Sequence, residues 1–360
     1  MKRDVVLFIQ KRTGKSGAPA ALLRLLAQKS IASLNPVLLA EKEGWLTQQC
    51  AEKGVPYLLQ PFPSSRSWAG KLWLNRAFAR RVVKMLSQQN SRARLIVGND
   101  HLEGILAREL GKAAAAPTAM FLRSSQTTRK DYFKYQCHKA DLIYTVGDDL
   151  RRRVLSWHPA SQAKLLDDGL VEEDFSPPKP KAAAFPQRIL VVGTEGQHKG
   201  WQDFAAAVEL LESDSHFPAL DFDFTGQPPA SPRRCKFHGV GRHENFREVV
   251  RRYDLVIHPS RMESFGLAMA EILAAGVPLL CSRVGVIEKI QKNPLLLFEP
   301  NNPRDMAKKI RHLRLHWPEI NFELEACQER LRLDFAADKI ASQLADDFSQ
   351  LLQRVGSVLN

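Results

Sequence analysis

The chain has 360 residues, of which 44% are hydrophobic and 25% charged, which is ordinary for a globular protein long enough for two domains. No run of about 18 apolar residues is present, so we expect no membrane-spanning segment. The first residues enter a short apolar strand instead of a signal peptide. Five widely spaced cysteines without a CxxC pair indicate reduced thiols and argue against a disulfide framework or a zinc site. We therefore expect a cytoplasmic protein.

The net charge of +13 is concentrated in the first half of the chain. Residues 1–175 carry +12, whereas residues 176–360 carry +1. This asymmetry favours an anionic partner for the first half. Nucleic acid, an anionic membrane surface and a phosphorylated acceptor all fit the charge. Charge that serves only solubility is the alternative.

Apolar runs bounded by turn residues predict several strands in the first half, with helices between them. A loop at residues 13–17 follows the first run. It lacks the P-loop motif, because Ile9 stands five positions before Gly14, where that motif requires glycine. The small residues Gly17 and Ala18 would let the backbone approach a phosphate or an acceptor closely. The predicted strands are residues 5–9, 36–39, 95–97, 118–122 and 142–146, and a helix is expected at residues 20–28.

Polar side chains follow two of these predicted strands. Asp100 and His101 come after the strand at residues 95–97, and Arg123 follows the strand at 118–122. The carboxyl ends of neighbouring parallel strands open into a binding cleft. These three residues are therefore candidates for contacts with sugar hydroxyls or with an acceptor, and ordinary loop polarity is the alternative.

The segment at residues 64–94 interleaves tryptophans with basic residues on an amphipathic helical pattern. Such a helix suits an anionic lipid surface. A packed surface helix of the first domain is the equally good alternative. The candidate surface residues are Trp68, Lys71, Trp73, Arg80, Arg81 and Lys84.

A proline-rich stretch at residues 175–187 predicts an extended linker. Strands and helices alternate again beyond it, which predicts an α/β fold with a doubly wound parallel sheet. The expected strands are residues 188–193, 220–225, 255–258 and 278–281, and the expected helices are 201–211, 246–253, 267–275 and 334–359.

Two acidic pairs invite a metal or catalytic interpretation that we do not adopt. Asp221 and Asp223 alternate along an expected strand, which favours a solvated strand face. Asp167 and Asp168 are interpreted as turn residues. No histidine or cysteine cluster has metal-ligand spacing. We therefore expect no metal and no other cofactor.

Residues 254–278 contain the most informative motif of the chain. An apolar strand stops at Pro259, a loop follows, and a helix begins near Leu267, beside Gly266. The free N–H groups and positive dipole end of such a helix form a phosphate cradle. Glu263 lies just before the cradle, and Glu271 lies about one turn into the helix. Two carboxylates that can bind hydroxyls beside an anion cradle suit a sugar nucleotide.

The segment from Glu263 to Glu271 resembles the signature of the retaining family 4 glycosyltransferases, in which seven residues separate two glutamates. The resemblance covers roughly residues 165–310, in the family's order. It implies the GT-B fold, in which two doubly wound Rossmann-like domains face each other across a cleft. The supporting motifs are Asp168-Gly169-Leu170, Phe175-Ser176-Pro177, residues 192–200, Gly239-Val240-Gly241, Gly276-Val277-Pro278 and Val284-Gly285.

The resemblance also implies the domain boundaries. It predicts an acceptor-side domain at residues 1–174, the linker at 175–187 and a nucleotide-sugar-binding domain at 188–337. A last helix, residues 338–360, is expected to pack back on the first domain.

The resemblance further implies a donor site. The family holds the donor diphosphate with a basic pair, of which Lys199 matches the lysine, whereas Thr194 replaces the arginine. His198, a basic residue of the first domain or helix N–H groups would then have to meet the second phosphate charge. At the strand end where the family often has a histidine, this chain has Arg123. The implied donor-binding residues are Gly17, Lys199, Ser264, Phe265, Gly266, Leu267 and Glu271, and the implied catalytic residues are Glu263, Asp100, His101 and Arg123.

The implied function is a retaining, metal-independent glycosyltransferase. It would move a sugar from a nucleotide diphosphate sugar to a glycan or glycolipid acceptor, in cell-surface polysaccharide or lipopolysaccharide synthesis at the inner face of the cytoplasmic membrane. A nucleotide-sugar 2-epimerase shares the fold and the donor, but it needs no acceptor surface. A nucleic-acid-binding protein follows from the charge alone, and the usual motifs are absent. We therefore expect a nucleotide-sugar donor, an acceptor and an anionic membrane surface as partners, and no nucleic acid.

Overall fold

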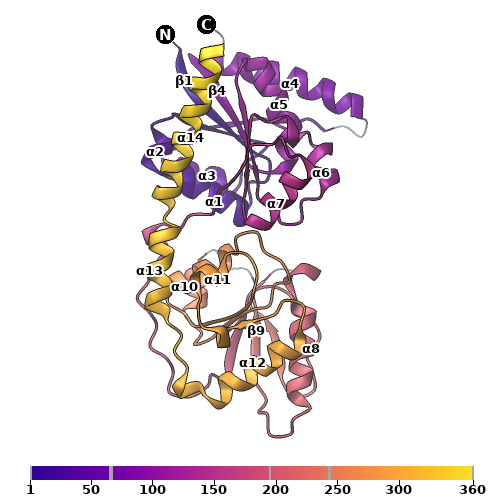
Figure 1. Ribbon diagram of the computed structural model, residues 1–360, viewed down its shortest axis with the longest axis vertical. Coiled ribbons are helices and arrows are strands. Elements are labelled where there is room, and N and C mark those ends of the chain that lie inside the picture. Colours follow the sequence, from indigo (N-terminus) through magenta and orange to yellow (C-terminus); the bar gives the residue numbers. More distant parts are fainter. Residues whose placement is uncertain (1, 65–67, 194–195, 242–244, 359–360) are drawn as a thin grey trace. The chain divides into compact units, whose positions relative to one another are not determined.

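The computed structural model describes residues 2–64, 68–193, 196–241 and 245–358, and only the backbone of residues 68–72 and 355–358. The chain forms two compact units (Figure 1). The first unit contains residues 1–169 and 335–360, and the second contains residues 170–334. Each unit is built around one parallel sheet.

In the described part of the first unit, the sheet has seven parallel strands in the order β3-β2-β1-β4-β5-β6-β7. The chain runs outward from β1 to β3, returns to place β4 beside β1, and then runs outward in the other direction. Near-continuous apolar runs in the central strands fit a sheet that is covered on both faces. The strands are β1 (Arg3–Gln10), β2 (Pro36–Ala40), β3 (Tyr57–Leu59), β4 (Ser91–Gly98), β5 (Thr118–Leu122), β6 (Leu142–Thr145) and β7 (Ala163–Leu165).

Helices cover both faces of this sheet (Figure 1), and the sheet separates the hydrophobic core into two clusters. One face packs against α1, α2, α3 and α14, and the other against α4, α5, α6 and α7. The helices are α1 (Gly17–Leu26), α2 (Lys29–Ala32), α3 (Trp45–Glu52), α4 (Trp68–Gln88), α5 (Gly104–Ala114), α6 (Arg129–Lys134), α7 (Asp148–Trp157) and α14 (Ala337–Val358), with 3-10 turns η1 (His101–Glu103) and η2 (Cys137–Lys139).

The last helix, α14, is part of the first unit although the whole second unit precedes it in the sequence. Its Phe348 is fully buried and lies 6.3 Å from the ring centre of Phe8 and 6.3 Å from that of Tyr144. The hydroxyl of Tyr144 donates to Asp347 at 2.8 Å, and Lys164 pairs with the same carboxylate. These contacts fix α14 along the sheet.

The described strands of the second unit form a six-stranded parallel sheet in the order β10-β9-β8-β11-β12-β13. Its path repeats that of the first unit: three strands run outward in one direction, and the others follow on the opposite side of β8. The strands are β8 (Arg188–Val191), β9 (Asp221–Phe224), β10 (Lys236–Gly239), β11 (Val256–His258), β12 (Leu279–Ser282) and β13 (Leu297–Phe298).

A cluster of aromatic rings fills one side of the second sheet. Phe222 and Phe224 alternate along β9 and point to the same face, where they meet Phe204 of α8 and Phe237 of β10. The helices and turns are η3 (Glu172–Asp174), η4 (Gln197–Lys199), α8 (Trp201–Glu212), α9 (Phe246–Val250), α10 (Leu267–Ala274), α11 (Ile287–Ile290), η5 (Pro294–Leu296), α12 (Pro303–Leu315), η6 (Trp317–Glu319) and α13 (Leu324–Asp334).

The strands predicted from the sequence are all present in the structure. The strands β3, β7, β10 and β13, which have only two to four residues each, were not predicted. The boundary of the first unit lies at Gly169, five residues before the expected one at residue 174.

The segment expected to be a linker, residues 175–187, packs onto the second unit. The backbone N–H groups of Ser176 and Lys179 donate to the carbonyls of Ala274 and Gly276, at the end of α10. The ammonium of Lys181 donates to three carbonyls at residues 317–320. The segment is extended, as proline requires, but these bonds make it part of the second unit.

The interpretation of Asp223 as a solvated residue is wrong. Its side chain is 0% exposed, and it accepts hydrogen bonds of 2.6 Å from the hydroxyl of Tyr253 and from Nε of Arg188. Asp221 on the same strand is exposed, as expected. A buried carboxylate needs partners, and Tyr253 supplies one from 30 residues further along the chain.

No helix among the described residues combines the length and the apolar composition that a membrane crossing requires.

We predict that Tyr253→Phe lowers the free energy of unfolding by about 1–3 kcal/mol, because it removes a donor from the buried carboxylate of Asp223. Chemical denaturation followed by circular dichroism measures the change. Tyr57→Phe is the matched control, since no hydrogen bond of the Tyr57 hydroxyl is found in the described part of the chain. Equal stabilities of the two variants would contradict the prediction.

Candidate functional site

Each sheet has one point where the strand order reverses, and ligands of open α/β sheets bind there, outside the carboxyl ends of the strands. In the second unit this point lies between β8 and β11, and in the first unit between β1 and β4. Lys199 and Glu263 follow β8 and β11, whereas Asp100 and His101 follow β4. The predicted residues therefore gather at the two switch points.

Two loops at the switch point of the second unit hold each other in place. We call residues 196–200 and 259–266 the paired loops. Arg261 of one loop donates to both oxygens of Asp203, in the first turn of α8, at 2.6 Å each. Its backbone N–H donates to the His198 carbonyl at 2.7 Å. A Cβ atom at Gly200 would overlap the carbonyl oxygen of Pro259, so only glycine allows this approach.

The paired loops bring Lys199 and Glu263 into direct contact. The ammonium of Lys199 lies 2.7 Å from Oε1 of Glu263, and the two side chains are 19% and 17% exposed. The cation expected to bind phosphate and the carboxylate expected to bind sugar thus form one ion pair. Thr194, where the family's arginine is expected, lies outside the described residues.

His258 lies beneath this pair as the last residue of β11. Its ring is 2% exposed, and Nε2 is 3.8 Å from Oε1 of Glu263. Burial lowers the pKa of His258 to about 4, so the ring is neutral at pH 7. Burial also acts to raise the pKa of Glu263, but the neighbouring charges outweigh it and hold that pKa below its ordinary value. Because His258 is neutral at pH 7, Lys199 supplies the positive charge there.

The start of α10 is shaped by two glycines in the left-handed region. Gly266, with φ of +91°, is the residue before the helix, and Gly285 has φ of +63°. A Cβ at Gly285 would overlap the carbonyl oxygen of Phe265. The N–H of Val286 donates to that same oxygen at 3.0 Å. The backbone at Phe265 is thus fixed from outside the helix, with Phe265 itself 2% exposed.

The other predicted residues of this motif lie around the start of α10. Ser264 and Leu267 are half-buried on either side of Gly266. Glu271 is also half-buried, on the same helix face as Leu267, while Met269 and Ala270 point into the core. Leu267 and Glu271 therefore lie together on the half-buried face of α10.

A buried polar network occupies the switch point of the first unit. Asn99, directly after β4, donates to Gln10 at the end of β1 and accepts a 2.7 Å hydrogen bond from Nε of Arg123. Arg123 also pairs with Asp168, and its side chain is only 5% exposed. The interpretation of Asp168 as a turn residue is wrong, because its carboxylate is the partner of this arginine. Arg123 is thus held inside the unit, where it can position neighbouring groups.

Asp100 and His101 lie beside this network. Oδ1 of Asp100 accepts from the backbone N–H of His101 and contacts Nδ1 of the same residue, at 2.6 Å each. Both side chains remain partly exposed, at 22% and 16%. A carboxylate on one ring nitrogen fixes the orientation of an imidazole and leaves the other nitrogen available.

Glu103, two residues further, is a buried carboxyl with a raised pKa. Oε1 accepts the backbone N–H of Lys11 at 3.0 Å, which ties the loop after β1 to η1. Burial, and next the nearby Asp100, raise the pKa of Glu103 to about 8. The side chain is therefore a neutral acid at pH 7. Gly17, the first residue of α1, is exposed and has open space around its Cα.

Several residues of the candidate site were not predicted from the sequence. A signal existed for two of them, since Asn99 directly follows β4 and His258 ends β11. The others depend on partners far along the chain, which no local pattern indicates. The full set of residues that were not predicted is Gln10, Asn99, Glu103, Asp168, Asp203, His258 and Arg261.

The described residues contain no group of three or more His, Cys, Asp or Glu side chains that could hold a metal ion.

Helix α4 carries the predicted membrane-facing residues that the structure describes. Trp73 is 69% exposed, and Arg80, Arg81 and Lys84 follow it on the exposed side of the helix. Arg76 adds to this stripe and pairs with the buried Glu109 of α5 at 3.2 Å. The side chains of Trp68 and Lys71 lie outside the described part of the structure.

We predict that the free energy of unfolding of Glu103→Gln, relative to that of the wild type, increases as pH rises from 5 to 8. Between the ordinary pKa of about 4.5 and the folded pKa of about 8, the unfolded chain ionises this carboxyl while the folded chain keeps it neutral. The wild type therefore loses free energy of unfolding with rising pH, by at most about 1.4 kcal/mol per pH unit. The amide of the variant keeps an acceptor for the Lys11 N–H and does not ionise. Urea denaturation at several pH values measures the difference, with exposed Glu329→Gln as control, and a pH-independent difference would contradict the prediction.

Comparison with known proteins identifies the fold and the second unit. Residues 186–315, which include the paired loops and α10, match the family model described as "Glycosyl transferases group 1". The gpi3 subunit of phosphatidylinositol N-acetylglucosaminyltransferase from Schizosaccharomyces pombe is 21% identical over 48% of this chain and 40% of its own length. Bacillus subtilis TuaC, a glycosyltransferase named for teichuronic acid biosynthesis, is 25% identical over 81% of this chain and 79% of its own length. The chain thus spans less than half of the first relative.

Among solved structures, Anabaena HepE in complex with UDP and glucose superposes with a TM-score of 0.75, at 15% identity, over 97% of this chain and 100% of its own. This likeness concerns the fold. The predicted fold is confirmed: the chain has the GT-B fold, and its residues 186–315 match the model of the group 1 glycosyl transferases.

Proposed function

We propose that this chain is a retaining glycosyltransferase that moves a sugar from a nucleotide diphosphate sugar to a glycan or glycolipid acceptor. The observation that carries the proposal is the ion pair of Lys199 and Glu263 at the switch point of the second sheet, beside the start of α10. It joins a cation suited to a diphosphate with a carboxylate suited to sugar hydroxyls. HepE, which has the same fold, was solved with UDP and glucose, which supports this class of donor.

The paired loops would stabilise the leaving group. When the glycosidic bond breaks, negative charge develops on the nucleotide diphosphate and positive charge on the sugar. Lys199 has three N–H donors, of which one reaches Glu263, so the others can meet phosphate oxygens. The backbone of residues 265–267 and the dipole of α10 add to this stabilisation. Glu263 would bind the sugar, and Glu271 the ribose.

We assign acceptor binding to the switch point of the first unit. The partly exposed Asp100 and His101 offer a carboxylate and an oriented imidazole for acceptor hydroxyls. Arg123 would act on them indirectly, since it is buried in the network with Asn99 and Asp168. The first unit also carries most of the positive charge, which suits an acceptor in cell-surface polysaccharide or lipopolysaccharide synthesis. The names of gpi3 and TuaC support an acceptor of the glycolipid or polysaccharide class.

We predict that Glu271→Ala raises the dissociation constant of the nucleotide diphosphate about 10- to 150-fold, since a hydrogen bond to a carboxylate contributes about 1.5–3 kcal/mol. Glu263→Ala should lower kcat more than it weakens binding, because the sugar contact matters most in the transition state. Calorimetry with nucleotide diphosphates and a transfer assay measure both effects. Exposed Glu325→Ala is the control. Normal activity of both variants, with the fold intact, would remove the site assignment.

We further propose that catalysis needs no metal. The described residues lack a metal-ligand cluster, and Asp223, the buried member of the acidic pair on β9, is already bonded to Tyr253 and Arg188. Turnover in excess EDTA should equal turnover without it. Complete loss of activity that magnesium or manganese restores would show the proposal to be wrong.

We also propose that α4 docks on an anionic membrane surface, which would hold the chain at the inner face of the cytoplasmic membrane. Each exposed basic residue near such a surface contributes about 1 kcal/mol, and salt weakens the attraction. Co-sedimentation with vesicles should rise with anionic lipid and fall with salt. Reversing Arg80, Arg81 and Lys84 to glutamate should abolish it without changing donor affinity.

The control for this reversal changes the same number of charges elsewhere on the first unit. Lys29, Lys42 and Lys53 are exposed and lie outside α4, and their reversal to glutamate should preserve vesicle binding. Equal effects of the two triple variants would mean that net charge, and not α4, governs the attraction.

A further inference from the structure

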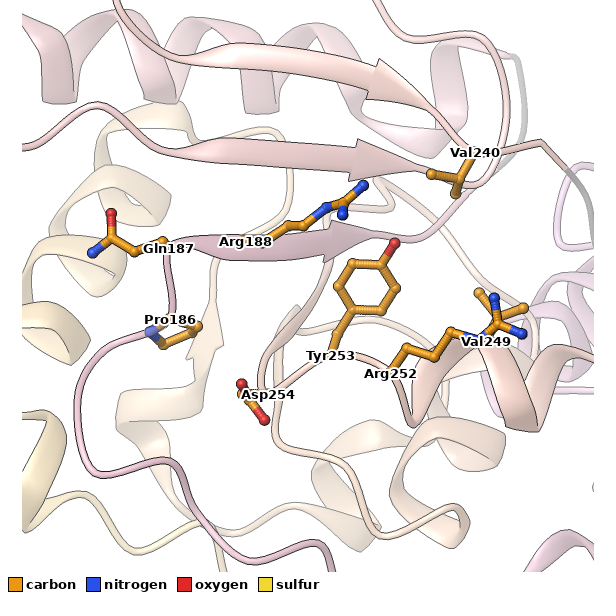
Figure 2. Close-up of a pocket in the computed structure, with 8 residues that line it drawn as sticks. All are labelled: Pro186, Gln187, Arg188, Val240, Val249, Arg252, Tyr253 and Asp254. Atoms are coloured by element: carbon orange, nitrogen blue, oxygen red, sulfur yellow. The ribbon is translucent and has the colours of Figure 1, made fainter.

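A pocket of about 620 Å³ lies on the second unit, and its lining includes none of the residues assigned to the donor (Figure 2). Gln187 and Arg188 stand at the start of β8, at the opposite end of that strand from the loop with Lys199. The opposite wall comes from α9 and the turn after it. The lining residues are Pro186, Gln187, Arg188, Val240, Val249, Arg252, Tyr253 and Asp254.

The buried Asp223 fixes two of these side chains. Its Oδ2 accepts hydrogen bonds from Nε of Arg188 and from the hydroxyl of Tyr253, each at 2.6 Å. Figure 2 shows the Arg188 side chain extending along β8, with the Tyr253 hydroxyl directed toward the same strand. Only Nε of Arg188 is used in this way. Its two terminal nitrogens make no hydrogen bond within the described residues, and its side chain is 65% exposed.

Two acidic side chains at the pocket are already paired. The carboxylate of Asp254 is paired with Lys179 at 2.7 Å, and that of Asp223 with Arg188. Arg252 is exposed, and its guanidinium has neither an ion pair nor a hydrogen bond in the part of the chain that the structure describes. The guanidinium of Arg252 and the terminal nitrogens of Arg188 are therefore open on the same pocket, and the exposed Asp221, which faces Arg188 in the sheet register, adds one negative charge near Arg188.

We propose that this pocket binds the phosphoryl group of a small ligand at a site separate from the donor site. Two guanidinium groups that offer unused, planar pairs of N–H donors suit the oxygens of a phosphoryl group. Asp223 holds the first of them in place before any ligand arrives, which lowers the entropic cost of binding. The pocket volume lies in the range of small-molecule sites, so it can hold more than the phosphoryl group alone. The amide of Gln187 would meet a polar group on the remainder of the ligand.

The experiment separates this pocket from the donor site by working in a Lys199→Ala background. Inorganic pyrophosphate is the probe, and calorimetry at constant ionic strength measures its dissociation constant. Lys199→Ala alone should still bind pyrophosphate. The additional change Arg252→Gln should weaken that binding about tenfold or more, because it removes charge-assisted hydrogen bonds. Arg304→Gln, which removes an exposed charge from the same unit, is the matched control and should leave it unchanged.

A second arm measures UDP binding to chains that retain Lys199. Arg252→Gln should leave the affinity for UDP as it is in the wild type. The proposal is overturned if Lys199→Ala abolishes pyrophosphate binding, or if Arg252→Gln and Arg304→Gln have equal effects on it. It is also overturned if Arg252→Gln weakens UDP and pyrophosphate alike, since the pocket would then be a part of the donor site.

Discussion

The mutual fixation of the paired loops is the constraint on which the second unit's site depends. The first loop contains only the 3-10 turn η4, and the second contains no helix or strand. A free loop would have to be ordered each time a ligand binds. Here the bidentate contact of Arg261 with Asp203 and the bond to the His198 carbonyl order them beforehand. The glycine at position 200 allows that approach, because any Cβ there would strike Pro259. Lys199 and Glu263 meet as a consequence of this backbone arrangement.

The two units share one sheet topology, but their switch points carry different groups of residues. In the second unit the switch point carries an ion pair that is partly exposed and can exchange partners. In the first unit it carries a network in which Asn99 connects β1, β4 and Arg123, and the charged members are almost completely buried. Breaking a buried ion pair such as Arg123 with Asp168 is costly, because it leaves a buried charge without its partner. We therefore expect the first network to serve as a rigid support, and the neighbouring Asp100 and His101 to make the contacts that change.

The sequence was sufficient for the central strands and for the motif from Glu263 to Glu271, because both rest on local patterns. Apolar runs define the strands, and a strand, loop and helix in direct succession define the site. It was insufficient where a residue's environment comes from distant segments. Asp223 looked solvated by its alternation along β9, but Tyr253 and Arg188 cover it. Asp168 looked like a turn residue, but Arg123, 45 positions earlier, buries it. Strand β10 was missed because only Phe237 among its four residues is buried.

The uneven charge of the chain also has a structural explanation. In the second unit, the basic residues near the site have acidic partners: Arg261 pairs with Asp203, and Lys199 pairs with Glu263. On α4 of the first unit, the basic residues that follow Trp73 are exposed. Glu109 of the neighbouring helix α5 already pairs with Arg76 and Lys112. The attraction of an anion to the exposed basic residues of α4 acts at a distance and is screened by salt. A ligand that replaces Glu263 beside Lys199, by contrast, must come into direct contact with the half-buried ion pair. Anion recognition by the first unit should therefore fall steeply with ionic strength, and recognition at Lys199 should depend mainly on how well a ligand replaces Glu263.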